Sequence, residues 1–590
     1  MPGIVGLITR QPRERVEPEL LRMLETLRHE PFYGTGTWID ETLGVYVGWT
    51  VRKGSFADVM PLRSQRDDVA LVFAGEEFRG PGDASYLLDV YESDATFPAA
   101  LNGRFHGLVA DRRRGTATLF DDRYGMQRLY YHQAPDAFYF AAEAKAILEV
   151  RPELRTIDPR ALGELITCGC VLENRSLFAG IRVLPPAAAW VFRNGALERT
   201  ASYFEPQEWE QQDLLAPDAY YAALRDVFSR QLPRYFGGSE PMAMSLTGGL
   251  DTRMILAWRR LQPRSLPCYT FGGTIRECRD VRVARAVARA CGQDHDVIRI
   301  GDADFMSRFA HYAARTVYLS DGCADVSRAP DLYANERARD IAPVRMTGNY
   351  GSEVLRGVRA FKPIVPRSGL FHADLHPDLE AAADTYRAAL QGHPLSFIVF
   401  RQAPWHHFGL LALEQTQLAV RTPYLDDELV RTAFRGPAAA FAGPDLCLRL
   451  IADGDRELRS IRTDRGLAGG RLGGAVRALQ EASFRAEYVF DYGMPQWLAR
   501  MNRVLAPMRL ERLFLGRHKF THFRVWYRGP LAGYVRDVLL DPRALSRPYV
   551  DGRRLQELVM AHTTGRGNYT WDLHKALTLE LVHRLFVDAR

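Results

Sequence analysis

One short segment constrains the fold of this chain more than any other. The apolar run Met242–Leu246 leads directly into the loop 247–252, whose sequence is TGGLDT, and a helical stretch follows. Adjacent glycines carry no side chains, so backbone N–H groups and the start of the helix can approach an anion closely. Asp251 beside such an anion is best explained as a Mg²⁺ ligand. We therefore predict a strand, a phosphate-binding loop and a helix in direct succession.

The rest of the C-terminal half alternates short apolar strands with longer helical stretches. The predicted strands are Met242–Leu246, Cys268–Phe271, Val297–Ile300 and Val344–Thr347. From about residue 405 onward the sequence is mainly helical and ends in an amphipathic helix, Asp572–Val587. Strand-then-helix alternation is typical of a parallel sheet covered by helices, whose ligands bind beyond the carboxyl ends of the strands. The chemistry is therefore expected directly after these strands.

The N-terminal part has a different pattern, with short strands separated by turns and few helices. The expected strands are Gly3–Leu7, Val45–Trp49, Val69–Phe73, Leu108–Ala110, Thr116–Phe120 and Phe138–Ala141, with one helix at Glu17–Arg28. Runs of this length and composition indicate a layered, β-rich domain. Because 590 residues are too many for one core, we predict two domains, residues 1–205 and residues 206–590.

Composition excludes several classes of protein. A formal net charge of +6 from 77 basic and 71 acidic residues gives only weak support for polyanion binding, so we expect no nucleic-acid partner. The seven cysteines form no C-x-x-C pair and no metal-ligand spacing, which indicates reduced thiols in a cytoplasmic protein. We find no signal peptide and no apolar run near the roughly 18–20 residues that span a bilayer. No membrane association is expected.

The loop 247–252 resembles the pyrophosphate-binding loop of the ATP pyrophosphatase superfamily, S-G-G-x-D-S, with threonine in place of both serines. The likeness continues into Tyr269–Gly272 and the following helix, which resemble the second nucleotide-binding strand of asparagine synthetases. It implies an ATP- and Mg²⁺-binding α/β synthetase domain with a parallel sheet and a helical C-terminal part. The residues that it implies for nucleotide binding are Leu246, Thr247, Gly248, Gly249, Asp251, Thr252, Phe271, Gly272 and Gly348.

The first residues, Met1–Leu7, resemble the M-C-G-I-x-G start of class II glutamine amidotransferases. The resemblance implies an Ntn-type αββα domain, in which an exposed cysteine is the nucleophile and its own amine the base. Pro2 stands where that cysteine would be, and it has no thiol. Ala74 replaces the asparagine of an N-G-E segment, whose amide would hold the oxyanion. We therefore predict a scaffold domain that cannot hydrolyse glutamine.

The segment Arg345–Val354 separates subfamilies of the synthetases. Asparagine synthetases carry S-G-E-G-x-D-E here, whereas β-lactam synthetases carry T-G-Y-G-S-D, which the present sequence resembles apart from an additional Asn349 and Glu353 in place of the aspartate. The resemblance implies that Tyr350 deprotonates the attacking amine and that Glu353, with Asp251, is a Mg²⁺ ligand. A phenol of pKa about 10 needs an acidic partner to act as a base near pH 7. We nominate Glu414 for that role.

The family also places a lysine in an R-x-K loop, and here Ile461–Gly466 has Asp464 at that position. Arg462 or Arg465 is expected to supply the positive charge instead, since arginine stabilises phosphate charge although it does not shuttle protons. Only five of the 77 basic residues are lysines. Lys362 and Lys519 remain alternative sources of the charge.

Loss of glutaminase activity is the pattern of relatives whose amine already belongs to a substrate, such as β-lactam synthetases and lasso-peptide cyclases. We expect a carboxylate to attack the α-phosphate of ATP, releasing pyrophosphate, and an amine then to displace AMP from the acyl-adenylate. The first choice of product is a lasso-peptide macrolactam, made from a peptide substrate with a leader-binding protein and a protease as partners. One alternative is an asparagine-synthetase-like amidotransferase that uses free ammonia or another small amine. Another is a catalytically silent scaffold of a biosynthetic complex.

Overall fold

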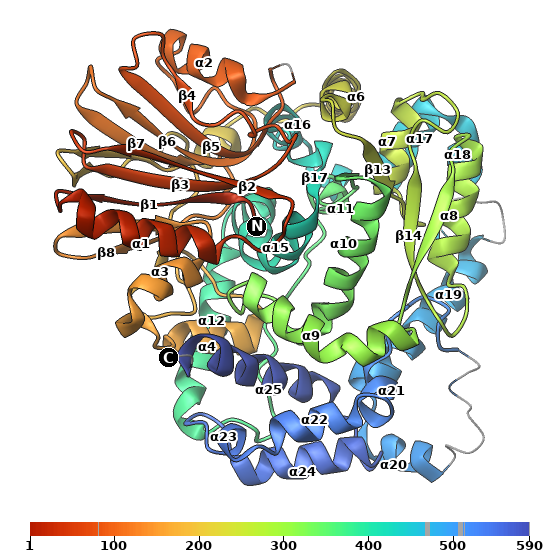
Figure 1. Cartoon of the computed structure of the whole chain (residues 1–590). Helices are drawn as coiled ribbons and strands as arrows, with labels where there is room; N and C mark the ends of the chain where they lie inside the picture. The colour runs from red at the N-terminus through yellow and green to blue at the C-terminus, as the bar shows by residue number, and fades with distance from the viewer. Residues whose placement is uncertain (81, 467–472, 505–510, 512–513, 589–590) are drawn as a thin grey trace.

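The N-terminal part of the molecule consists of two stacked antiparallel sheets (Figure 1). The computed structural model describes residues 1–80, 82–466, 473–504, 511 and 514–588. The first sheet has the order β10-β8-β9-β1-β3-β2, and the second has the order β12-β11-β7-β6-β5-β4. The strands are β1 (Gly3–Thr9), β2 (Tyr33–Asp40), β3 (Val45–Arg52), β4 (Leu62–Arg63), β5 (Val69–Glu77), β6 (Gly103–Asp111), β7 (Thr116–Asp121), β8 (Tyr130–Gln133), β9 (Ala137–Ala141), β10 (Arg182–Val183), β11 (Ala189–Arg193) and β12 (Ala196–Arg199).

Alternating side chains explain how these two sheets pack. In β3, Val45, Val47 and Trp49 point into the apolar layer between the sheets, where they meet Val72 of β5. Tyr46 points to the other face and packs with the helices there. Because side chains alternate along a strand, one sequence serves both layers. Helices α1 (Arg13–Thr26) and α3 (Ala144–Val150) cover this outer face, as the αββα prediction requires.

The C-terminal part contains a five-stranded parallel sheet in the order β15-β14-β13-β16-β17. Its strands are β13 (Met242–Ser245), β14 (Cys268–Gly273), β15 (His295–Ile300), β16 (Val344–Met346) and β17 (Ala419–Arg421). From β13 the chain proceeds to β14 on one side, and later to β16 on the other side. The order therefore reverses between β13 and β16, and ligands of such sheets bind at that switch point.

Helices surround this sheet and form the lower layer of the molecule in Figure 1. Those used below are α4 (Pro159–Cys168), α7 (Asp251–Trp258), α8 (Arg279–Ala290), α11 (Gly351–Arg356), α14 (Ala403–His406), α15 (Phe408–Gln417), α19 (Gly473–Tyr488) and α25 (Thr570–Val582). The π-helical turn His583–Val587 extends α25. The predicted α/β fold, with its two unlike domains and helical C-terminal part, is confirmed.

The segment after β17 holds the two domains together. Arg421 donates to Glu76 of β5 at 2.8 and 2.9 Å, and Asn102 donates to Asp426 at 2.8 Å. Asp426 also caps the helix that follows it, so this segment has a structural role. None of the helices in the described ranges combines the length and apolarity needed to cross a membrane. All seven cysteines are unpaired.

Candidate active site

Two loops meet at the switch point of the parallel sheet. One follows β13 and enters α7 at Asp251, and the other follows β16 and enters α11 at Gly351. A Cβ atom on Gly348 would lie 2.7 Å from the amide nitrogen of Thr252, and one on Gly351 would lie 2.9 Å from the Cβ of Asp251. Glycine at both positions lets the loops touch. The structure therefore brings together the two segments that the sequence singled out.

The predicted metal ligands, Asp251 and Glu353, lie in this contact. Asp251 Oδ2 accepts a hydrogen bond from the Ser352 hydroxyl at 2.5 Å, while its buried Oδ1 has no partner among the described residues. Burial raises the pKa of Asp251. Burial, together with the charge of Asp251, raises the pKa of Glu353 to about 7. Two buried carboxyl groups that repel each other, one with an unpartnered oxygen, fit a divalent cation.

Within the described residues, no group of three or more acidic, histidine or cysteine side chains could hold a metal ion. The protein therefore offers two carboxylates, and nucleotide phosphates and water would complete the coordination, as is usual for Mg²⁺.

Arg356 also belongs to this site, and the sequence argument missed it. Its guanidinium donates to the Ser352 hydroxyl, and its charge partly offsets the burial of Asp251 and Glu353 by lowering their pKa values. The available signal was its spacing, because a residue three positions after Glu353 on α11 lies on the same face of the helix.

The backbone amides of the glycine loop donate hydrogen bonds to side chains of the protein. The N–H of Gly248 donates to Asp280 Oδ1 at 2.6 Å, and that of Gly249 donates to the Thr247 hydroxyl at 3.4 Å. The contact of the Gly248 amide with a phosphate stays a prediction, and it requires the hydrogen bond to Asp280 to be exchanged for one to the phosphate. Asp280 lies in the first turn of α8, and burial raises its pKa to about 6. Thr252 is buried beside the loop.

Asp464 occupies the position at which the family has the lysine of its R-x-K loop. Its backbone N–H donates to the carbonyl oxygen of Gly248 at 3.4 Å, so the segment 461–466 does lie against the nucleotide loop. Arg253, buried in α7, donates to the carbonyl oxygens of both Gly248 and Ile461 and ties the two segments together. The resemblance therefore identified the right loop.

The two arginines nominated to supply the charge lie on this loop and are exposed. The guanidinium of Arg465 is 4.3 Å from the ring centroid of Phe484 in α19. Burial, together with the charges of Arg279, Arg465 and Arg517, lowers the pKa of His518 to about 4. Arg465 thus belongs to a basic group near the loop, whereas Arg462 has no such neighbours in the described contacts.

Tyr350 lies at the N-terminus of α11 with a left-handed backbone, φ 71°. Its ring centroid is 5.1 Å from that of His407, whose Nε2 is 3.9 Å from Glu353 Oε1. Burial raises the pKa of Tyr350, which opposes a base role in this state. Glu414 is near enough to influence that pKa, but its ion pair is with Arg345, at 2.9 Å. The partnership of Tyr350 with Glu414 stays a prediction.

The residues expected around the adenosine are at the carboxyl end of β14 and beside it. Leu246 is buried and its carbonyl oxygen accepts from Thr270 at 2.7 Å. The Phe271 ring is 6.2 Å from that of Phe520. A Cβ on Gly272 would lie 2.8 Å from Val297, so this strand requires glycine there for packing. Leu246, Phe271 and Gly272 therefore lie near one another at the end of the sheet.

A cavity of about 940 Å³ lies among helices of both domains. Helices α4, α14, α15 and α25 contribute to its wall, so both domains enclose it. His406 lines the cavity, and the adjacent His407 contacts Tyr350 and Glu353. Its charged lining residues are Arg328, Lys362, Arg367, Lys575, Asp325 and Asp572. The excess of basic over acidic groups suits a substrate that carries carboxylates. Lys519, the other alternative cation, pairs instead with Asp491 at 2.7 Å.

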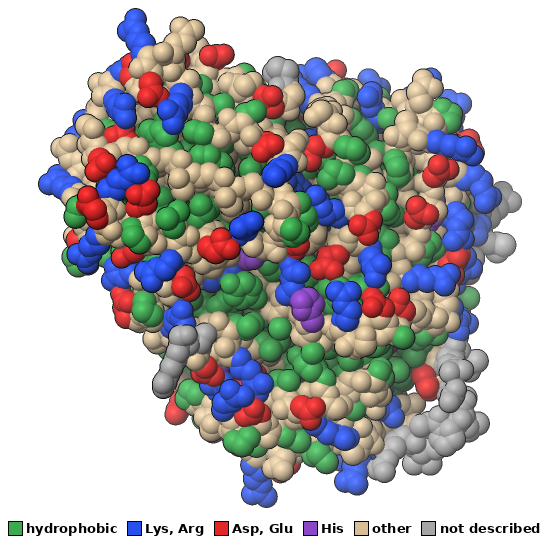
Figure 2. Space-filling view, in the orientation of Figure 1, with side chains coloured by type: hydrophobic (Ala, Val, Ile, Leu, Met, Phe, Trp, Pro, Cys, Tyr) green, Lys and Arg blue, Asp and Glu red, His purple; other side chains and the backbone are tan. Residues whose placement is uncertain are grey.

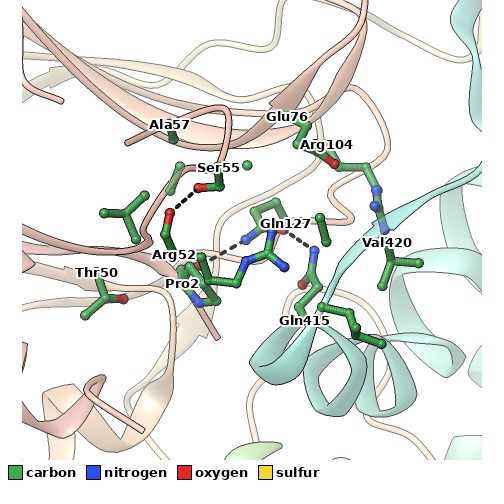
Figure 3. Close-up of a pocket in the computed structure, with 15 residues that line it drawn as sticks. Pro2, Thr50, Arg52, Ser55, Ala57, Glu76, Arg104, Gln127, Gln415 and Val420 are labelled. Atoms are coloured by element: carbon green, nitrogen blue, oxygen red, sulfur yellow. Dashed lines mark hydrogen bonds between the residues drawn. The ribbon is translucent and has the colours of Figure 1, made fainter. Parts of the chain in front are cut away.

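A second pocket, of about 50 Å³, lies between the two domains. Pro2 and Ala74, which occupy the two altered glutaminase positions, both line it. Figure 3 shows that the pocket lies at the domain boundary, with Gln415 of α15 on one side. The side chain of Gln415 donates to Gln127 at 2.7 Å, and Gln127 donates to the carbonyl oxygen of Pro2 at 3.3 Å. Pocket volumes of roughly 300–1,000 Å³ are usual for small ligands.

Comparison with known families supports both halves of this description. Residues 1–204 match the family model of the glutamine amidotransferase domain, and residues 223–409 match that of asparagine synthase. Asparagine synthetase [glutamine-hydrolyzing] 1 of Bacillus subtilis is 22% identical over 390 residues, which are 61% of this chain and 60% of that protein. The chain belongs to the asparagine synthetase superfamily.

Two further matches cover a smaller part of this chain. Amidase chry2 of Gibberella zeae is 21% identical over 338 residues, covering 50% of this chain and 49% of that protein. A glutamine phosphoribosylpyrophosphate amidotransferase of B. subtilis has 12% identity and a TM-score of 0.26, covering 50% of this chain and 65% of that one. The matches thus span about half to two thirds of the relatives, 49% to 65% of their length.

Proposed function

We propose that this protein is an ATP-dependent ligase that adenylates a carboxylate and couples it to an amine. The observation that carries the proposal is the contact of Asp251 with the Glu353 loop at the switch point. Nothing in the packing of a parallel sheet requires two buried acidic groups to share one place, and their mutual repulsion costs stability unless a cation relieves it.

In this proposal the protein side chains position the substrates, and the metal ion would neutralise negative charge on the phosphates of ATP. Asp251 and Glu353 would hold Mg²⁺, which supplies positive charge to the phosphates of ATP. Arg356 and the basic group around Arg465 stabilise the pyrophosphate that leaves, because guanidinium groups bind phosphate oxygens in a bidentate manner. Tyr350, which packs on His407, would accept the proton of the attacking amine with Glu414 as its acidic partner. AMP then leaves as the amide forms.

We further propose that the substrate is a peptide and the product a macrolactam, as in lasso-peptide cyclases. The cavity of about 940 Å³ supports this choice, since it lies at the upper end of the range for small-molecule pockets and far exceeds the needs of one amino acid. A cytoplasmic location, with a leader-binding protein and a protease as partners, belongs to the same proposal. It agrees with seven unpaired cysteines.

A second candidate is an amidotransferase that uses free ammonia or a small amine, which the similarity to asparagine synthetase 1 favours. The two are separated by supplying ATP and Mg²⁺ with either a linear core peptide or aspartate and ammonium. The macrolactam proposal predicts AMP release and a peptide product lighter by one water. Asparagine formation without peptide turnover would support the second candidate, and no AMP with any substrate would favour the silent scaffold.

A further inference from the structure

The small pocket between the domains contains polar groups that are buried but not satisfied. Arg52 Nε, Arg104 Nη1 and Gln415 Oε1 have no hydrogen-bond partner among the described residues. All three side chains line the pocket, and Figure 3 shows them around one space. Arg52 and Arg104 are only 8% and 6% exposed. Buried donors without partners are costly, and several around one cavity indicate a missing ligand.

The carboxylates near this pocket leave two of its donors without an acceptor. Glu76 is on its wall, but that carboxylate already accepts two hydrogen bonds from Arg421, at 2.8 and 2.9 Å. The charges of Arg52 and Arg104 act to lower the pKa of Glu76, and the charge of Arg52 acts in the same direction on Glu240. Asp122, on the Arg104 side, accepts from three backbone amides in its own turn. None of the described carboxylates accepts a hydrogen bond from Arg52 Nε or Arg104 Nη1, and such buried, charged donors are costly without an acceptor.

Size restricts what the counter-ion can be. A volume of about 50 Å³ holds a few water molecules or one small ion, since a single water needs roughly 10–15 Å³ on this measure. Glutamine is too large for it. Guanidinium groups pair best with planar or tetrahedral oxyanions, and Gln415 Oε1 can accept a hydrogen bond from a proton-bearing oxygen.

We propose that the former glutaminase pocket binds one small oxyanion, of the hydrogen phosphate or bicarbonate type, which joins the two domains. Arg52 and Arg104 come from the N-terminal domain, whereas Gln415 comes from α15 of the synthetase domain. An ion held by all three groups therefore links the domains. Gln415 directly follows Glu414 in α15, so the ion also fixes the helix that borders the synthetase site.

The test is thermal unfolding of the full chain in phosphate, bicarbonate or acetate, each against chloride at equal ionic strength. We expect a saturable rise of Tm with at least one of these ions, and the three arms identify which. Arg104→Met should remove this rise, whereas Arg114→Met, at an exposed arginine in the turn after β6, should keep it. The Tm rise caused by ATP and Mg²⁺ should survive in both variants, which separates this pocket from the nucleotide site.

Arg52→Gln is the second variant if Arg104→Met does not fold. The proposal fails if no oxyanion raises Tm, or if the rise persists unchanged in the variants of Arg104 and Arg52. A crystal of the wild-type chain soaked in the effective ion should show it between the two guanidinium groups, and water alone at that place would also overturn the proposal.

Discussion

The two pockets of this molecule differ in size and in the side chains that line them. The small pocket measures about 50 Å³ and is lined in part by Pro2 and Ala74, whereas the large cavity measures about 940 Å³ and is lined by His406, whose neighbour His407 contacts Glu353. Both regions keep their fold, with complete sheets and buried cores. The N-terminal fold therefore does not depend on the cysteine and asparagine that Pro2 and Ala74 replace.

The N-terminal domain nevertheless contributes to the synthetase half. Its helix α4 forms part of the wall of the large cavity, and Figure 2 shows a continuous surface with basic and acidic side chains interspersed over the visible face. Its retention is thus explained by packing and by substrate enclosure. The predictions below test each side of the comparison, beginning with the greatest effect.

Replacement of Asp251 by asparagine is expected to abolish adenylation while the fold remains intact. The change removes the negative charge of a proposed Mg²⁺ ligand and leaves the side-chain volume almost unchanged. Loss of a residue that only supports a metal ligand typically costs about 10–100-fold in metal affinity or activity, and loss of the ligand itself is expected to cost more. ATP–pyrophosphate exchange with substrate measures the effect. Asp294→Asn, at an exposed position, is the matched control. Exchange at the wild-type rate in Asp251→Asn removes this residue from the mechanism.

Tyr350→Phe is expected to slow amide formation by roughly 10²–10⁴-fold while adenylation continues, because the phenol acts on the amine after pyrophosphate has formed. The phenyl ring preserves the packing on His407. Rapid-quench measurements should show acyl-adenylate accumulating ahead of product. If both steps fall together, or neither changes, Tyr350 is not the base.

The strands of the parallel sheet could be predicted where the sequence has a distinct apolar pattern. The strands β13, β14 and β16 are apolar runs with clear ends, and they were found almost to the residue. The strand β17 was missed, since three residues with no alternation resemble the turn that follows. Edge strand β2 was also missed, because glycine and threonine weaken its apolar pattern.

The candidate site could be predicted only where one segment carries the signal. Asp251 and Glu353 were found because each lies in a recognisable loop. The engagement of Gly248 with Asp280 and the pairing of Glu414 with Arg345 depend on segments that are distant in sequence. Such contacts arise from tertiary packing, so no local pattern contains them.

Glu76→Ala tests the scaffold role of the N-terminal domain. It leaves Arg421 buried without its carboxylate partner, and breaking a buried pair in this way costs about 3–5 kcal/mol. We expect the domains to separate at a lower urea concentration, whereas the synthetase activity without urea should be unchanged. Glu198→Ala, which breaks the exposed pair with Arg193, is the control and should change the midpoint little. An unchanged midpoint in Glu76→Ala would show that the domains do not depend on this pair.

Lys575→Met should give the smallest effect, a rise of about tenfold in the KM for a carboxylate-rich substrate at unchanged kcat, equivalent to about 1.4 kcal/mol. Lys575 lines the large cavity, and burial lowers its pKa. Lys53→Met, at an exposed lysine of the N-terminal domain, is the control. A fall in kcat with KM unchanged would place Lys575 in the chemistry rather than in substrate binding.

The central claim is that one half of the chain is an active synthetase and the other half a silent glutaminase domain. Its most direct test measures AMP, amide product and glutamate together, in one reaction containing ATP, Mg²⁺, substrate and glutamine. We predict one AMP for each amide formed, with glutamate release no greater than in a boiled control, because Pro2 provides no thiol nucleophile and Ala74 no oxyanion donor. Glutamate released in step with AMP would contradict this account.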